Sequence, residues 1–384
     1  MTTERDFYEE VMGYTRRERE RAFTGPVVVR GKDRPWRQER QGFVKYYLWP
    51  SRYSGGPAET PVDDWAVFTQ EIRVHSGRHR HQGGLAIHIL EGEGYSIVDG
   101  VRYDWEAGDL LMLPLKVGGV EHQHFNRYED VPAKWVAFIN AALYDWGGSE
   151  LVQLQDHPDW RGRGSGEEPA ISGQERAAAA TGGFGVAGGA GPAARAGRGV
   201  SSHLGGQAGG GALEASDDPR AGGRAVRSKT LLDWLFELRD TQRALREEAP
   251  AVLKARDVPW EWNANGKMQW FLHPAMERTA IPSLVVYVQE IPPGGRTGRQ
   301  RVPGGAVLFM LRGKGYTLLD GERHDWEAED CLNLPIRPQG TVVQHVNQEA
   351  ERSAAFISVE LSLVHTLGVD RGSAFEQIEM APEP

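Results

Sequence analysis

Residues 77–84 read G-R-H-R-H-Q-G-G. This stretch places His79 and His81 two residues apart. Side chains at positions i and i+2 of a β-strand point to the same face, so these two imidazoles can share one metal ion. A third ligand must come from another strand. Three neutral imidazoles with open coordination positions suit iron, zinc, copper, nickel or manganese, and spacing alone does not choose among them.

Short apolar runs separated by turn residues follow this stretch. The runs are Ala86–Leu90, Tyr95–Val98 and Leu110–Leu113, and the turns between them contain Gly92-Glu-Gly94 and Asp99-Gly100. Strands of this length with Asp-Gly turns indicate antiparallel β-structure. Many short strands in succession predict a small barrel or jelly roll.

The chain also contains an internal duplication. Pro35-Trp36 recurs as Pro259-Trp260 at an offset of 224 residues, and from Gly77 onwards the offset is 221. At that offset the matching pairs are Gly94-Tyr95 with Gly315-Tyr316, Asp99-Gly100 with Asp320-Gly321, Asp104-Trp105 with Asp325-Trp326, Asp109 with Asp330, and Pro114 with Pro335. Chance does not produce so long an alignment, so the sequence predicts an all-β fold of two barrels in one chain.

A helix is predicted before each barrel, and a linker between them. The helical spacing is carried by Phe7, Val11 and Tyr14 in the first half and by Leu231, Leu235, Leu238 and Leu245 in the second. The stretch 164–227 holds more than a third of the chain's 48 glycines. It cannot bury enough apolar area to offset chain entropy, which predicts a disordered Gly/Ala-rich linker. The predicted domains are therefore residues 1–163 and 228–384.

The stretch 121–126, E-H-Q-H-F-N, offers two candidates for the third ligand, His122 and His124. The second copy distinguishes them. At an offset of 221 it has Gln300 for His79, Val302 for His81 and Val343 for His122, but it retains His124 as His345 and Asn126 as Asn347. The three lost histidines form a coherent ligand set. The sequence therefore predicts one metal ion per chain, in the first barrel, bound by His79, His81 and His122. His124 is either a structural residue or an acid–base group beside bound substrate.

The motifs at 77–81 and 122–126 resemble the two sequence motifs of the cupin superfamily, and the resemblance covers both halves outside the linker. It implies a bicupin of two jelly-roll barrels. The chain is similar in particular to the gentisate 1,2-dioxygenase and 1-hydroxy-2-naphthoate dioxygenase group, which has a His-Arg-His motif, a Gly-Glu-Gly turn and no motif glutamate. Many other cupins have a glutamate four or five residues after the second histidine of the motif. Leu85 and Ala86 occupy those positions here. The resemblance implies a non-haem Fe(II) enzyme that uses O2 to cleave the ring of a hydroxylated aromatic acid, and it implies that His124 contacts the substrate. Mn, Zn and Ni are the alternative metals.

One departure concerns the substrate. That group has an arginine that helps to hold the substrate carboxylate, and the matching residue here is Ile87. Arg78, Arg80 and Lys116 are candidate replacements, although each also fits an ordinary solvated surface charge. Asn126 is a further candidate for substrate contact.

The composition argues against several classes of protein. The 384 residues carry a net charge of −9 with no basic block, so no nucleic-acid partner is expected. No apolar run approaches the length of a membrane span. The single cysteine, Cys331, excludes an intrachain disulfide and fits a cytoplasmic protein. By resemblance we expect a homodimer or homotetramer that takes a small aromatic substrate and O2. The alternatives are another metal-dependent cupin enzyme (isomerase, lyase or oxygenase) or a non-catalytic cupin that binds a metal or small ligand.

Overall fold

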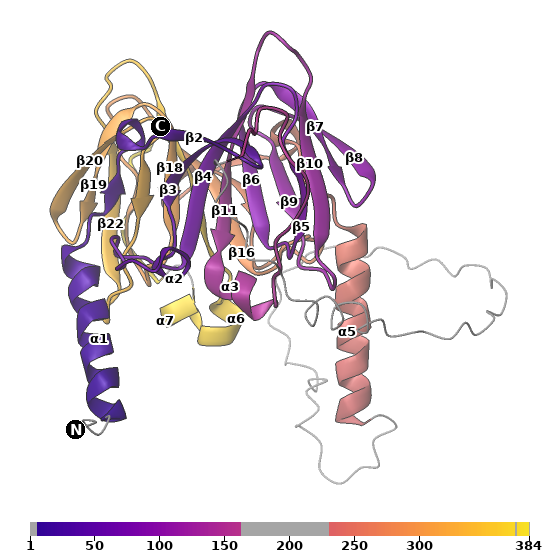
Figure 1. The fold of residues 1–384 in the computed structure, drawn as a ribbon. Helices are drawn as coiled ribbons and strands as arrows, with labels where there is room; N and C mark the ends of the chain where they lie inside the picture. Colours follow the sequence, from indigo (N-terminus) through magenta and orange to yellow (C-terminus); the bar gives the residue numbers. More distant parts are fainter. Residues whose placement is uncertain (1–5, 163–229, 373–374, 384) are drawn as a thin grey trace, which may run out of the picture. The chain divides into compact units, whose positions relative to one another are not determined.

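A computed structural model describes residues 6–162, 230–372 and 375–383 (Figure 1). The predicted linker, 164–227, lies outside the described residues. The chain divides into two units. One consists of Met1–Trp160 with Arg239–Pro384 and contains both barrels; the other is Arg161–Leu238, whose described part includes the first turns of one helix.

The two predicted helices are confirmed as α1 (Phe7–Thr24) and α5 (Leu231–Glu248). Each helix begins at side chains that cap its first turn. The Asp6 carboxylate accepts hydrogen bonds from the first-turn backbone of α1, and Thr230 and Asp233 bond each other's backbone N–H groups at the start of α5. None of the helices among the described residues combines the length and apolar character that crossing a bilayer requires.

The first barrel consists of two antiparallel sheets. Its seven-stranded sheet has the order β13 (Val252–Leu253), β9 (Leu110–Leu113), β6 (Leu85–Glu91), β11 (Ala133–Asn140), β4 (Trp65–Ile72), β3 (Gly42–Leu48) and β2 (Trp36–Glu39). Its five-stranded sheet has the order β12 (Val152–Gln155), β5 (Arg78–His81), β10 (Val120–Asn126), β7 (Glu93–Val98) and β8 (Val101–Glu106).

The second barrel repeats this arrangement, as the duplication predicts. Its seven-stranded sheet has the order β1 (Val28–Val29), β21 (Cys331–Asn333), β18 (Val307–Arg312), β23 (Ala354–Leu361), β16 (Leu284–Ile291), β15 (Gly266–Leu272) and β14 (Trp260–Asn263). Its five-stranded sheet has the order β20 (Glu322–Glu327), β19 (Lys314–Leu319), β22 (Thr341–Asn347), β17 (Arg299–Val302) and β24 (Glu376–Glu379). The short helices are α2 (Ser51–Ser54), α3 (Ala141–Trp146), α6 (Val364–Leu367) and α7 (Val369–Gly372), with 3₁₀ turns at Gly31–Asp33 and Ala255–Asp257.

The predicted Asp-Gly turns are present in both barrels. Asp99 and Gly100 both have positive φ values, 47° and 82°, as a two-residue turn between antiparallel strands requires. Gly94 on β7 is also required, because a Cβ there would lie 2.2 Å from the ring of Trp105. The recurrence of these residues in the second copy is therefore explained by packing.

The two halves exchange an edge strand. β1 comes from the first half but pairs with β21 of the second barrel, and β13 comes from the second half but pairs with β9 of the first. A barrel in space is consequently not one contiguous half of the chain.

Two buried carboxylates hold the exchanged segments. Asp109 accepts hydrogen bonds from Lys254 Nζ at 2.7 Å and from the backbone N–H of Ala255 at 2.9 Å. Asp330 does the same with Arg30 Nη1 at 2.7 Å and the N–H of Gly31 at 2.9 Å. Since both carboxylates are 1% exposed, removing either partner would leave a buried charge uncompensated.

A single apolar core joins the barrels. It includes Trp65 and Phe138 from the first seven-stranded sheet and Phe271 and Phe309 from the second. Cys331 is also part of this core; it is fully buried, and burial raises the pKa of its thiol. A small-hydrophobe role for Cys331, rather than a nucleophilic one, follows from this position.

His88 on β6 leads to a prediction about pH and stability. Burial lowers its pKa to about 4, against an ordinary value of 6.5, and its Nδ1 has no hydrogen-bond partner among residues 6–162, 230–372 and 375–383. Between about pH 6.5 and pH 4 the His88 imidazole is protonated in the unfolded chain but stays neutral in the folded chain. His88 should therefore destabilise the fold as pH falls through this range. The expected loss between pH 7 and pH 5 is about 2 kcal/mol of unfolding free energy.

His88→Phe, which copies Phe309 at the matching position, should reduce that loss by about the same amount. Urea unfolding of both proteins at pH 7 and pH 5 measures the difference. Equal pH dependence in the variant and the parent would contradict a neutral, buried His88.

Candidate metal centre

Strand β5 places the two histidines of the His-Arg-His motif inside the first barrel. Burial alternates along it, with Arg78 and Arg80 exposed and His79 and His81 buried. β5 lies between β12 and β10, and in the β10 register His122 is directly opposite His79. The i, i+2 spacing and this register bring three imidazoles to one interior face.

The three side chains converge closely enough to hold one metal ion. One ring nitrogen from each of His79, His81 and His122 lies within 4.8 Å of the others. In the part of the chain that the structure describes, this is the only group of three or more His, Cys, Asp or Glu side chains with such geometry. No carboxylate belongs to it.

Backbone hydrogen bonds orient two of the rings. His122 Nδ1 lies 3.1 Å from the carbonyl oxygen of Val120, and His81 Nδ1 contacts the carbonyl oxygen of Gln82. A carbonyl can only accept, so both Nδ1 atoms carry the proton and both Nε2 atoms keep a lone pair. A metal-bound histidine usually has its other nitrogen fixed in this way. The Nδ1 of His79 is buried, and no described residue is its hydrogen-bond partner.

Burial keeps the cluster neutral. It lowers the pKa of His79 to about 3, aided by the nearby His81 and His124. It also holds the pKa of His122 well below its usual value and lowers that of His81. Because an imidazole must be deprotonated to bind a metal ion, these residues fit the donor set that a metal requires.

The comparisons with known proteins agree with this architecture. Residues 68–139, which include β5 and β10, match the family model described as the cupin domain. The structure of a mutant of Bacillus subtilis oxalate decarboxylase is similar with a TM-score of 0.52 at 15% identity, over 88% of this chain and 77% of that one. The fold is that of a bicupin.

A second similar structure is salicylate 1,2-dioxygenase from Pseudoaminobacter salicylatoxidans, solved as adducts with gentisate. It gives a TM-score of 0.43 at 18% identity, over 91% of this chain and 78% of that one. No curated protein matches this bicupin in sequence.

His124 is held by an arrangement that both barrels share. Its Nδ1 lies 2.7 Å from Ser96 Oγ, which also accepts a hydrogen bond from Trp105 Nε1 at 2.9 Å. In the second barrel His345 bonds Thr317 Oγ1, and Trp326 donates to the same oxygen. Since the arrangement recurs where the other three histidines are absent, it supports a structural role for His124. His124 is also buried next to His122, with ring centroids 5.5 Å apart.

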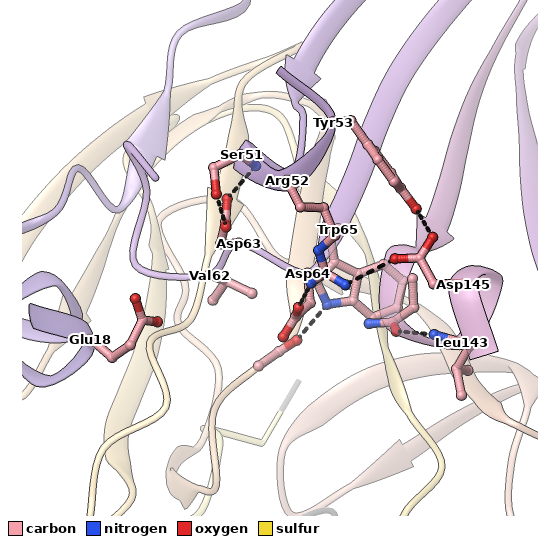
Figure 2. A network of polar contacts seen from close by, with 12 residues as sticks. Glu18, Ser51, Arg52, Tyr53, Val62, Asp63, Asp64, Trp65, Leu143 and Asp145 are labelled. Atoms are coloured by element: carbon pink, nitrogen blue, oxygen red, sulfur yellow. Dashed lines mark hydrogen bonds and ion pairs between the residues drawn. The ribbon is translucent and has the colours of Figure 1, made fainter. Parts of the chain in front are cut away.

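Helix α3 brings Tyr144 to the edge of the cluster. The Tyr144 ring lies 5.6 Å from that of His81, centroid to centroid. Figure 2 shows how the neighbouring residue fixes α3: the Asp145 carboxylate accepts hydrogen bonds from Tyr53 at 2.6 Å and from Arg52 at 3.2 Å. Two residues of α2 therefore position the helix that covers this side of the site. Tyr144 could not be identified from the sequence, because no motif marks it.

The structure does not bring the four predicted substrate-contact residues into the cluster. Arg78 and Arg80 point away from the histidines because neighbours on a strand face opposite sides. Arg78 pairs with Glu121 at 3.1 Å, and the exposed Lys116 pairs with Asp99 at 2.7 Å. The side-chain amide of Asn126 donates to three backbone carbonyls, those of Arg73, Tyr128 and Val131. This fixes a turn and explains its recurrence as Asn347.

Trp135 is a second residue near the cluster that no sequence motif marks. It lies on β11, is 3% exposed, and packs against His124 and Phe68 with ring centroids 5.4 and 5.8 Å away. Its indole N–H has no hydrogen-bond partner in the described parts of the chain. A buried donor left unpaired is costly, so this N–H is a candidate partner for a bound molecule. The second copy has Phe356 at this position, and the loss of the N–H there is the signal that could have identified it.

Substitutions copied from the second barrel test the ligand set. His79→Gln and His122→Val should each lower the bound Fe(II) or Zn²⁺ from one ion per chain to well below one, because two imidazoles remain. His124→Gln, on the same strand as His122, should keep one ion. Metal analysis of the purified proteins after removal of free metal gives the stoichiometry. Metal loss in His124→Gln together with retention in His122→Val would reverse the assignment.

Proposed function

We propose that this bicupin is a metal-dependent enzyme, specifically a non-haem Fe(II) dioxygenase that uses O2 to cleave the ring of a hydroxylated aromatic acid. The observation that carries the proposal is the cluster of three buried, neutral histidines without a carboxylate. His79, His81 and His122 would hold the metal ion. Three protein ligands leave coordination positions open for other molecules.

Charge balance supports an anionic substrate. Three neutral ligands leave the charge of a divalent ion uncompensated at a buried place. An oxygen donor with a carboxylate and an adjacent hydroxyl would neutralise that charge and occupy two positions. When bound, Fe(II) would supply the binding and activation of O2. The exposed Arg78, Arg80 and Lys116 lie outside the cluster, so none of these three side chains is placed to hold a substrate carboxylate there.

The protein's own contribution is orientation and the exclusion of water. Phe68, Ile87 and Trp135 belong to the buried apolar cluster of the first barrel. An aromatic ring would pack against such side chains, and the unpaired N–H of Trp135 could donate to one of its oxygens. Ile87 is fully buried, at the position where the gentisate dioxygenase group has an arginine. The substrate is therefore expected to differ from gentisate in its contacts.

O2 uptake tests the proposal directly. Anaerobically prepared, Fe(II)-loaded protein is offered hydroxybenzoates, hydroxynaphthoates and catechols while O2 is followed with an electrode and products by mass spectrometry. We expect uptake with at least one acid that carries a hydroxyl beside its carboxylate, and a product heavier than the substrate by both oxygen atoms of O2.

The control is His79→Gln, which should abolish uptake. A metal-loaded protein with one ion per chain that consumes no O2 with any member of the panel would refute the dioxygenase. Turnover without O2, or with Mn, Zn or Ni, would instead indicate another metal-dependent cupin enzyme. Binding without turnover would indicate a non-catalytic cupin.

Trp135→Phe gives an independent prediction about orientation. The variant copies Phe356 and removes only the indole N–H and part of the ring. Loss of one hydrogen bond to the substrate should lower kcat/KM by about tenfold, corresponding to about 1.4 kcal/mol. Metal content should stay at one ion per chain. Unchanged steady-state kinetics would show that the N–H does not contact the substrate.

A further inference from the structure

The second barrel contains a cavity where the first has its histidine cluster. The cavity has a volume of about 360 Å³ and is lined by Gln300, Val302 and Val343, the residues that replace the three histidines. This is more than twice the roughly 150 Å³ of an engineered apolar cavity that binds benzene. The loss of the ligand set has left a space large enough for a substituted ring.

The lining of this cavity combines apolar and polar side chains. Met268, Leu308 and Leu334 contribute apolar surface, together with Val302 and Val343. Polar groups come from side chains such as Asn265, Gln300 and His345. Pockets for small molecules typically combine a largely apolar wall with a few polar groups that fix orientation.

Asn265, one of the lining residues, has a buried side-chain oxygen that is not hydrogen-bonded to any described residue. The residue is 9% exposed, and its amide nitrogen donates to Gln289 Oε1 at 3.3 Å. Its Oδ1 is buried and has no hydrogen-bond partner among the described residues. An amide oxygen is an acceptor only, so a molecule that bonded this oxygen would have to present an O–H or N–H group.

The charges of the lining disfavour a carboxylate. Among the described residues, no lysine or arginine lines the cavity, and Glu360 is its one carboxylate. A substrate carboxylate buried here would lie near the Glu360 carboxylate, with no lysine or arginine of the described lining to pair with it. The two barrels thus differ in chemistry: the proposed metal centre suits an anion and this cavity suits a neutral molecule.

The size of one lining residue also favours an open cavity. Ala306 lines it, and the matching residue of the first barrel is Leu85. A barrel that had lost its site without a replacement would gain from filling the space, because voids cost packing energy. The second barrel instead has the smaller side chain, that of Ala306, in the lining of the cavity.

We propose that the second barrel is a metal-free binding site for a neutral molecule of about one ring that carries a hydroxyl or N–H donor. Its apolar body would pack against Val302, Leu308 and Val343, and its donor would bond Asn265 Oδ1. This inference does not depend on the proposed dioxygenase.

The test is a ¹⁹F NMR titration with 4-fluorophenol and 4-fluorobenzoate, which share a ring but differ in charge. Both are titrated into the full chain carrying His79→Gln, so that no metal in the first barrel takes part. We expect 4-fluorophenol to bind at least tenfold more tightly than 4-fluorobenzoate. Ala306→Leu, which copies Leu85, and Val343→Phe should each weaken its binding by at least tenfold.

The two filling variants lie on different segments, so either one that retains the thermal unfolding transition of the parent suffices. The chain with an unmodified first barrel serves as the reference and should bind 4-fluorophenol with the same affinity as His79→Gln. Equal affinity for the two probes, absence of 4-fluorophenol binding at millimolar concentration, or binding that the filling variants leave unchanged would overturn the proposal. A failed search for O2 uptake would not affect it.

Discussion

The buried carboxylates of Asp109 and Asp330 are the interactions on which the arrangement of the two barrels depends. Each holds a basic side chain and a backbone N–H from the opposite half of the chain. Because a buried carboxylate is stable only when it is paired and hydrogen-bonded, each barrel completes its seven-stranded sheet only when the other half is in place. The exchanged strands and the shared core then form one continuous unit, and the five-stranded sheets remain on the sides that do not join the barrels.

The candidate metal centre depends on the different positions of the two kinds of sheet. The seven-stranded sheets bury apolar residues against one another, whereas β5 and β10 belong to a five-stranded sheet whose inner face lines the barrel interior. Alternation along β5 puts histidines inside and arginines outside, and the β10 register sets His122 opposite His79. The site is thus fixed by sheet geometry and by the carbonyls that orient His81 and His122, with no loop required to close the ligand set.

Much of this could be predicted from the sequence. The strand Leu110–Leu113 has the predicted bounds, and the joint loss of three histidines from the second copy pointed to the group that the structure brings together. Alternation alone should have excluded Arg78 and Arg80, since they neighbour the histidines on one strand. The strand exchange could not be predicted, because β1 and β13 are two residues long and pair with segments far away in sequence. Trp135 and Tyr144 belong to no motif, and only the fold shows that they lie near the cluster.

The contrast between the barrels follows from the cost of burying imidazoles. In the first barrel His79 is 5% exposed with an unpartnered nitrogen, an arrangement that burial disfavours unless another partner compensates it. A bound metal ion would supply that compensation, because its binding free energy adds to that of folding. In the second barrel Val302 and Val343 remove the same cost without any ion, while His345 keeps its hydrogen bond to Thr317. The hydrogen-bonded arrangement around His124 and His345 is thus common to both copies, whereas the three histidines whose burial a metal ion would compensate are present only in the first.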